Sequence, residues 1–221
     1  MCALLLVSES LVDGTGEART FTIGDEHFDS VRLGLGALGI ITALTFGVEP
    51  LFGLEATEGP LTWDDLLEDY DRLLDTHHHC DLMWFPHTDK VLAKCNRRVA
   101  DLDELEPVGA ADAWLNEFTE NTAFGLVNRL GDLRPASRPA LARLTGRLLS
   151  ERTYSDVAHR VFTSPRRVVF REMEYAVPRE AALDALRECR ARIERSDWKI
   201  SFPVEIRSAP GDDLALSTAS G

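Results

Sequence analysis

The spacing of hydrophobic and polar positions predicts a chain that mixes strands and helices. Residues 1–12, 19–23 and 40–48 are rich in aliphatic and β-branched side chains, which is typical of strands. The turn residues Asp13 to Gly16 separate the first two, so we expect a hairpin there. The first 50 residues therefore predict three strands, the first two of them paired in a hairpin.

From about residue 51 helical spacing joins the strand pattern. A short strand is expected at 52–57, and Thr62 with Asp65 resembles a capping box at the start of a helix. The apolar positions of that helix recur at intervals of three and four: Trp63, Leu66, Leu67, Tyr70, Leu73 and Leu74. Residues 81–86 and 90–99 are expected to pair as strands around a turn.

The second half of the chain repeats this mixture. An acidic loop over 101–110 precedes two helical stretches. We expect a long strand over 166–177, a helix that begins near Pro178, and a last strand over 198–207. This order predicts an α+β fold with a mainly antiparallel sheet and helices on one face.

Charge and composition exclude several classes of protein. The 221 residues carry a formal net charge of −13, which argues against a nucleic-acid partner, and no polybasic run provides a membrane anchor. No apolar run is long enough for a transmembrane segment. Four cysteines without a C-x-x-C pair predict a reduced, cytosolic-type protein.

The segment Gly34 to Gly39 matches the spacing G-x-G-x-x-G. A dinucleotide fingerprint opens a helix, whereas Ile40 to Val48 favours a strand, so a Rossmann site is rejected. Two interpretations remain. The glycines either form a turn packed closely between strands, or let the backbone pass close to a cofactor.

Histidines offer little evidence of a metal site. His77, His78 and His79 are consecutive and cannot all face one ion, so a solvated helix end is expected and no metal site. His87 lies in the turn after Pro86. It is a candidate either for a structural hydrogen bond within the turn or for contact with a substrate.

Residues 202–207 (FPVEIR) show strand alternation. The apolar Phe202, Val204 and Ile206 would share one face, and Glu205 and Arg207 the other. An acid and a guanidinium on one face can bind a hydroxylated substrate together. The alternative is a solvated strand face with an ion pair on it.

Four segments together resemble the aldonolactone oxidase family, which includes D-arabinono-1,4-lactone oxidase, L-gulonolactone oxidase and the related alditol oxidases. They occur in matching order along nearly the whole chain: Arg32 to Thr42, Trp84 to Thr88, Phe170 to Pro178 and Phe202 to Arg207. The last resembles the strand that carries the family's active-site Glu-x-Arg.

The resemblance implies an FAD-dependent oxidoreductase with a PCMH-type FAD-binding domain of the vanillyl-alcohol-oxidase class. Its substrate would be a sugar lactone, oxidised at a CH–OH group by hydride transfer to flavin, with O₂ or another compound as electron acceptor. The resemblance implies catalytic roles for Glu205 and Arg207. It implies FAD contacts for five residues: Gly36, Ala37, Gly39, Ile40 and Ile41.

The family pattern is incomplete in this sequence. Residues 1–50 would be the C-terminal part of the FAD-binding domain, and residues 51–221 a truncated substrate-binding domain. An upstream pyrophosphate-binding lobe, an N-terminal histidine for tethering flavin and a C-terminal His-Trp-x-Lys are not found. We therefore expect a fragment that is inactive alone and does not retain FAD.

Two rival functions stay open. One is an alditol-oxidase-type enzyme acting on a polyol, and the other is a flavin-free, non-catalytic α+β binding module. The expected location is cytoplasmic, with peripheral association at a membrane left open.

Overall fold

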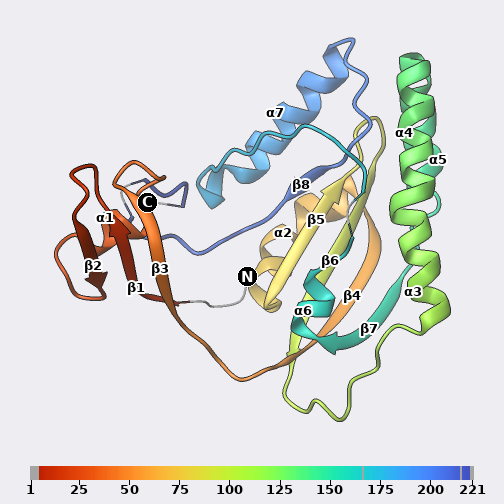
Figure 1. Ribbon diagram of the computed structural model, residues 1–221. Coiled ribbons are helices and arrows are strands. Elements are labelled where there is room, and N and C mark those ends of the chain that lie inside the picture. The colour runs from red at the N-terminus through yellow and green to blue at the C-terminus, as the bar shows by residue number, and fades with distance from the viewer. Residues whose placement is uncertain (1–4, 166, 215, 220–221) are drawn as a thin grey trace. The chain divides into compact units, whose positions relative to one another are not determined.

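The computed structural model of the protein describes residues 5–165, 167–214 and 216–219 and divides into two compact units (Figure 1). The first unit comprises Met1–Pro50, Glu174–Pro178 and Ala209–Gly221, and the second Leu51–Met173 and Arg179–Ser208. The chain first passes between them after Pro50. Assigning the two units to an FAD-binding and a substrate-binding domain stays a prediction.

The first unit contains a three-stranded antiparallel sheet in the order β2-β1-β3. Its strands are β1 (Leu5–Val12), β2 (Ala18–Thr22) and β3 (Ile40–Gly47), close to the three segments that the aliphatic and β-branched composition predicts. The short helix α1 (Phe28–Arg32), which the sequence reading missed, buries Phe28 and Val31. The G-x-G-x-x-G run leads into strand β3, so the strand expected after it is confirmed.

The second unit is built on a five-stranded antiparallel sheet in the order β7-β4-β6-β5-β8. The bounds of its strands are β4 (Gly53–Thr62), β5 (His79–Trp84), β6 (Lys90–Val99), β7 (Arg152–Val157) and β8 (Val204–Ile206). The predicted pairing of β5 with β6 is confirmed. Strand β8 is an edge strand that pairs with β5.

Helices α2 (Trp63–Thr76) and α7 (Ala182–Arg195) cover one face of this sheet (Figure 1). Their apolar stripes follow from spacings of three and four residues, which place side chains on one helix face. The buried cluster joins these stripes to alternate residues of β5 and β6, including Leu82, Trp84 and Val91. The predicted α+β fold with an antiparallel sheet is confirmed. The two long helices share one face, and the short helix α6 (Ala158–Phe162) packs on the other face against Leu54 and Ala56 of β4.

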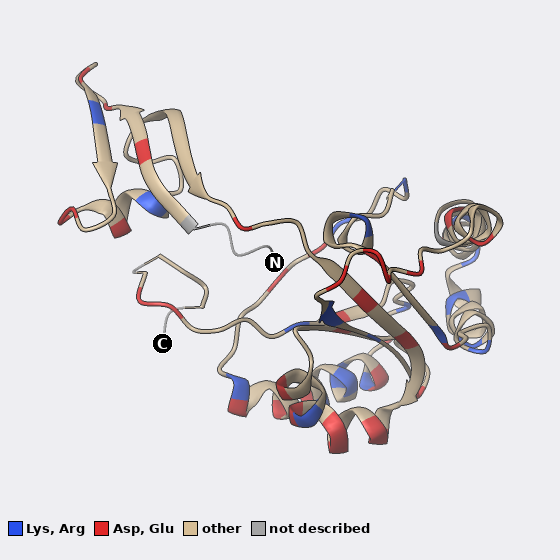
Figure 2. Cartoon of the chain, turned by 90° about the horizontal axis from the view of Figure 1, so that it is seen from below, with Lys and Arg blue, Asp and Glu red and all other residues tan. Residues whose placement is uncertain are grey.

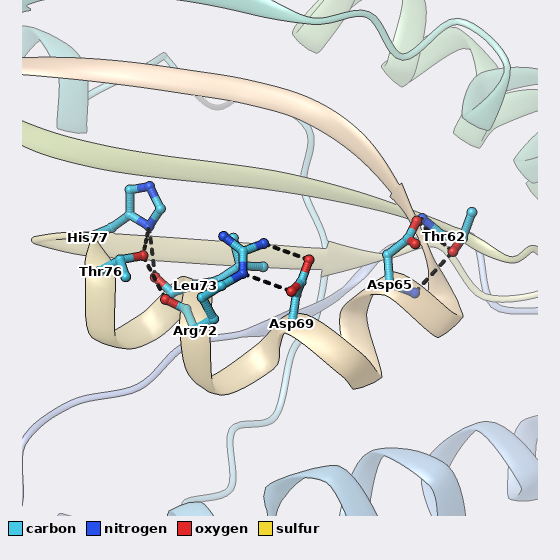
Figure 3. Close-up of polar contacts among 7 residues, drawn as sticks. All are labelled: Thr62, Asp65, Asp69, Arg72, Leu73, Thr76 and His77. Atoms are coloured by element: carbon cyan, nitrogen blue, oxygen red, sulfur yellow. Dashed lines mark hydrogen bonds and ion pairs between the residues drawn. The ribbon is translucent and has the colours of Figure 1, made fainter.

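Both ends of helix α2 are satisfied by side chains (Figure 3). The Thr62 hydroxyl accepts from the Asp65 N–H at 3.1 Å, and the Asp65 carboxylate accepts from the Thr62 N–H at 2.8 Å. At the other end, Nδ1 of His77 lies 2.9 Å from the Leu73 carbonyl and the Thr76 hydroxyl donates to the Arg72 carbonyl at 2.6 Å. The predicted capping box is confirmed.

A helical insertion lies between β6 and β7. It consists of α3 (Ala110–Glu117), the π-helix η1 (Phe118–Ala123), α4 (Phe124–Leu133), the 3₁₀ turn η2 (Pro135–Ser137) and α5 (Arg138–Gly146). Arg138 at the start of α5 connects this helix to α4 and to the segment before β8. Its guanidinium contacts Asp132 at 2.6 Å and donates to the Lys199 carbonyl at 2.8 Å. Within the described residues, no helix is long and apolar enough to span a bilayer.

The prediction of a long strand over 166–177 is wrong. Residues 167–177 form no regular secondary structure, and position 166 lies outside the described residues. Val169 is 97% exposed, so its β-branched side chain does not pack against a neighbouring strand, and such packing is what strand preference reflects. The strand expected over 198–207 is reduced to β8, which has three register partners in β5.

Three other elements depart from expectation. Strand β7 and helix α6 (Ala158–Phe162) were not predicted, and the helix near Pro178 begins as the 3₁₀ turn η3 (Arg179–Ala181). The expectation of reduced cysteines is wrong for one pair, because Cys80 and Cys95 are joined in a disulfide. They are direct cross-strand partners in β5 and β6, a register that their spacing in sequence does not reveal.

We predict that Thr62→Ala lowers the free energy of unfolding of the second unit by about 1 kcal/mol, because it removes one half of the capping box. Denaturant unfolding followed by the fluorescence of the buried Trp63 and Trp84 measures this loss. Asp64→Asn, in the same turn but outside the capping box, is the control and should have a smaller effect. Equal losses in both variants would contradict the capping role.

Candidate functional site

The face of the five-stranded sheet opposite α2 and α7 carries charged side chains. Because direct cross-strand partners point to the same face, the register places Arg152, Glu58, Lys94 and Asp81 in one row across β7, β4, β6 and β5. Glu205 on β8 is paired with Met83, two residues from Asp81, and so points to the same side. We call this surface the charged face.

Glu58 is the centre of a nearly buried ionic network on this face. Its side chain is 6% exposed, and its two oxygens lie 3.4 Å from Lys94 Nζ and 2.6 Å from Arg152 Nη2. The Tyr154 hydroxyl donates to the same carboxylate at 3.1 Å. One acid, two cations and a phenol thus bond to one another around a carboxylate that is almost fully buried, with Lys94 and Arg152 20% and 31% exposed.

Lys94 also connects this network to helix α6. Its ammonium donates to the Tyr154 hydroxyl at 3.2 Å and to the Val161 carbonyl, in the last turn of α6, at 3.1 Å. With Glu58, this gives the ammonium three acceptors for its three N–H groups. Lys94 therefore holds α6 against the sheet.

The network fixes the charge state of its members. Burial alone raises the pKa of Glu58, but hydrogen bonding from Arg152 and the positive charges of Lys94 and Arg152 outweigh it, so the pKa lies below the ordinary 4.5. Burial alone lowers the pKa of Lys94, but Tyr154 and Glu58 raise it above its ordinary value. Both groups are charged at neutral pH.

Glu205 and Arg207, the candidate catalytic pair of the sequence analysis, lie at the edge of the sheet. Val204 and Ile206 turn toward the core under α2 and α7, and Glu205 turns away from it. Nε of Arg207 lies 3.6 Å from the Glu205 carboxylate, and the two side chains are 58% and 31% exposed. The alternation of Glu205 with its apolar neighbours is confirmed, and its catalytic role stays a prediction.

The third apolar residue of this segment behaves differently from the prediction. Phe202 precedes β8 and packs outside the main core, stacking on Phe170 at 4.7 Å and meeting Phe124 of α4 edge-on at 5.1 Å. This aromatic group ties the segment before β8 to the helical insertion. The position of Glu205 thus depends on the insertion as well as on β5.

His87 is a structural part of the turn between β5 and β6. Its φ of 68° is unusual for a residue with a side chain, and its Nε2 accepts the Ile200 N–H at 3.1 Å. Burial lowers the pKa of His87 below its ordinary 6.5, and the charges of Lys199 and Arg143 lower it further. The neutral ring therefore holds the segment that leads into β8, and substrate contact by His87 stays a prediction.

The glycine-rich segment forms an exposed turn in the first unit. Gly36 and Gly39 have φ of 74° and 156°, and a Cβ on Gly39 would lie 2.4 Å from the Val12 carbonyl oxygen. Gly39 is thus required for close packing on β1, in accord with the structural interpretation. Gly36 and Ala37 are exposed, and Ile40 and Ile41 begin β3 with side chains that are also exposed, so a cofactor could reach them.

The sequence reading missed the Glu58 network. The signal was present as alternation along 53–62 and 90–99, but Glu58, Lys94 and Arg152 meet only once the register of three strands is known. Across the described residues, no group of three His, Cys, Asp or Glu side chains is arranged to hold a metal ion. The charged face thus offers hydrogen bonds and fixed charges.

Comparison with known proteins gives consistent matches. The sequence model of the D-arabinono-1,4-lactone oxidase family matches residues 44–221. The L-gulono-1,4-lactone dehydrogenase of Mycobacterium tuberculosis is 34% identical over 216 residues, covering 98% of this chain and 50% of that protein. The L-gulonolactone oxidase of Bos taurus is 27% identical over 198 residues, covering 87% and 43%. The chain spans about half the length of these curated relatives.

A solved structure shares the fold. Cholesterol oxidase from Brevibacterium sterolicum superimposes with a TM-score of 0.70 at 14% identity, covering 91% of this chain and 43% of that one. At this identity the likeness concerns the fold alone.

We predict that Glu58→Gln lowers the free energy of unfolding by about 3 kcal/mol, because Lys94 and Arg152 would lose their buried counter-charge. The lowered pKa of Glu58 means that its stabilisation is complete above pH 4.5 and is lost as pH falls below that value. The free energy of unfolding of the variant should therefore fall less than that of the wild type as the pH is lowered. Denaturant unfolding at pH values above and below 4.5 measures this difference.

The matched control is Glu55→Gln, on the same strand. Glu55 forms an exposed ion pair with Arg97 at 2.7 Å, so its loss should cost less than about 1 kcal/mol. If Glu58→Gln resembles this control, the buried network does not stabilise the sheet.

We predict that the Ile200 N–H loses hydrogen-exchange protection as the pH falls below 6.5, because a protonated His87 cannot accept its bond. A folded-state pKa below 6.5 gives stabilisation that is full above pH 6.5 and is lost as pH falls. In His87→Ala, protection should be low above and below pH 6.5. The Phe85 N–H, which bonds the Lys90 carbonyl at 3.0 Å, is the internal control, and a parallel change there would refute a specific role for His87.

Proposed function

The chain belongs to the D-arabinono-1,4-lactone oxidase family, and we propose that it is part of an FAD-dependent oxidoreductase that oxidises a CH–OH group of a sugar lactone. The observation that carries this proposal is the placement of Glu205 and Arg207 at the edge of the charged face, 3.6 Å apart and directed away from the core. The family match over residues 44–221 supports it, because that range includes the segment Glu205 to Arg207, which resembles the family's Glu-x-Arg motif.

Arg207 would orient the substrate and stabilise charge. Its guanidinium presents planar N–H donors that can bind the lactone or ring oxygens. Held near the substrate oxygen or near the flavin when it is bound, it would favour the negative charge that develops there during hydride transfer. Arg207 directly follows β8, which pairs with β5, and its side chain is 58% exposed.

Glu205 would act on the hydroxyl that is oxidised. As an ionised carboxylate it accepts a hydrogen bond from this group and can take its proton. The nearby guanidinium of Arg207 keeps a counter-charge within reach. The two side chains would thus divide proton removal and charge stabilisation between them.

FAD, when bound, supplies the hydride acceptor for this chemistry, and its use by the family supports its place here. The described residues fit an edge contact rather than a complete binding site. Gly36 and Ala37 present an exposed backbone without large side chains, beside exposed Ile40 and Ile41. Loss of FAD from the isolated 221-residue chain stays a prediction.

The substrate proposal concerns an aldonolactone, with O₂ or another acceptor as oxidant. The names of the curated relatives, which refer to L-gulono-1,4-lactone and D-arabinono-1,4-lactone, support a lactone over a polyol. Oxidation of L-gulono-1,4-lactone by the intact protein that carries this chain tests the proposal. Turnover of polyols without turnover of lactones would favour the alditol oxidase alternative. An intact protein that contains no flavin would favour the non-catalytic binding module. We also propose that the protein is located in the cytoplasm.

We predict that Arg207→Ala in the intact protein lowers kcat/KM for the lactone by roughly 100-fold, or about 2.7 kcal/mol, with flavin content unchanged. Arg207→Lys should restore only part of this loss, because an ammonium is not a planar fork of donors.

Arg187→Ala is the control, because Arg187 lies on α7 in an exposed pair with Asp184. A kcat/KM near that of the wild type in Arg207→Ala would return the Glu205–Arg207 pair to a solvated ion pair on a strand edge.

A further inference from the structure

One acid in the sheet of the second unit has no partner in the fold. Acidic and basic residues lie within the strands of this sheet as well as on the helices (Figure 2), and Asp81 of β5 is directly opposite Lys94 of β6. Lys94 nevertheless directs its three N–H groups to the Glu58 network and to helix α6. Asp81 is half-buried, and across the part of the chain that the structure describes its carboxylate forms no hydrogen bond and no ion pair. This carboxylate is therefore available to a ligand.

The strand register places Asp81 beside the candidate catalytic pair. Strands β5 and β8 are antiparallel neighbours at the edge of the sheet (Figure 1), with Met83 opposite Glu205. One further step of this register sets Asp81 opposite Arg207, which directly follows β8. Asp81 is also the diagonal neighbour of Glu205, and such neighbours on one face of a sheet are about 7–8 Å apart.

Apolar side chains lie between the two carboxylates. Met83 separates Asp81 from Glu205 on this face, and Leu92 of β6 is the other cross-strand partner of Met83. Both apolar residues are half-buried. Sites for small molecules are typically apolar surfaces with a few polar groups that fix the orientation of the ligand. The arrangement therefore suits a molecule whose carbon skeleton carries hydroxyl groups at several positions.

We propose that Asp81 is a specificity-determining residue of the lactone site. Its carboxylate accepts a hydrogen bond from a substrate hydroxyl other than the one that is oxidised. The inference rests on the proposed function, because it takes Glu205 and Arg207 as the reacting end of the site. Glu205 would hold the reacting hydroxyl, and Asp81 would bind a hydroxyl further along the carbon skeleton.

The chemistry of a carboxylate suits this role. It only accepts hydrogen bonds, its two oxygens can serve two hydroxyl groups at once, and hydrogen bonds to a charged acceptor are stronger than neutral ones. Arg207 adds donors next to Asp81, so carbonyl or ring oxygens and hydroxyl groups of one ligand both find partners. Orientation of Arg207 by Asp81 is the competing role, and it predicts a loss of kcat rather than of affinity.

Steady-state kinetics of the intact protein that carries this chain test the role of Asp81. The probes are L-gulono-1,4-lactone and its deoxy analogues, each of which lacks one hydroxyl group that is not oxidised. Asp81→Ala should raise KM for the lactone roughly 10-fold or more, because a hydrogen bond to a charged group is lost, and should leave kcat within about 2-fold of the wild type. The wild type should bind one deoxy analogue as weakly as Asp81→Ala binds the lactone, and Asp81→Ala should bind that analogue and the lactone alike. Asp81→Asn keeps one acceptor oxygen and should raise KM less.

Glu55→Ala is the matched control, because it removes the same charge from β4 at a position that alternation turns to the opposite face from Glu58. It should keep the KM of the wild type, and all variants should keep the flavin content and tryptophan emission of the wild type. An unchanged KM in both Asp81 variants of a protein that oxidises the lactone overturns the inference alone. So does an equal loss of kcat for the lactone and every analogue, which would indicate that Asp81 orients Arg207. A wild-type protein that oxidises no lactone overturns the proposed function, and the inference with it.

Discussion

The antiparallel register of β4, β6 and β5 is the constraint on which the second unit depends. Because successive side chains of a strand alternate between faces, one set of residues meets α2 and α7. The other set combines the charged residues Glu58 and Lys94 with the apolar Leu54 and Ala56, which pack against α6. A shift of one residue would turn Glu58 and Lys94 away from their partners and toward the apolar core under α2 and α7. Because burying an unpaired charge is costly, the observed strand register is favoured over shifted registers.

The same register assembles a stable support for the candidate site. Lys94 joins the sheet to α6, and the Glu58 carboxylate joins β4 to β7. On the other side, His87 and the aromatic group around Phe202 hold the segment before β8. Glu205 therefore lies on the edge strand β8 and Arg207 directly after it, and the segment that leads into β8 is restrained, although β8 itself has only three residues.

Local signals in the sequence predicted much of this unit, and long-range pairing explains what they missed. The capping box at Thr62 and the β5–β6 pair follow from spacing within a few residues. The predicted strand over 166–177 rested on composition without a partner, and Val169 has no strand to pack on among the described residues. The Glu58 network and the Cys80–Cys95 pair required a register that no short window contains. Residues matching the family's Glu-x-Arg drew attention to Glu205 and Arg207, and the fold supplies the reason for their exposure.

The central claim is that Glu205 and Arg207 mark the substrate side of the sheet. A crystal structure of the intact protein with an aldonolactone or its oxidised product bound tests this claim most directly. The account predicts ligand oxygens within hydrogen-bond distance of the Arg207 guanidinium and the Glu205 carboxylate, on the side of the sheet that faces away from α2 and α7. A ligand bound on the helix-covered side, or one that touches neither residue, would contradict it.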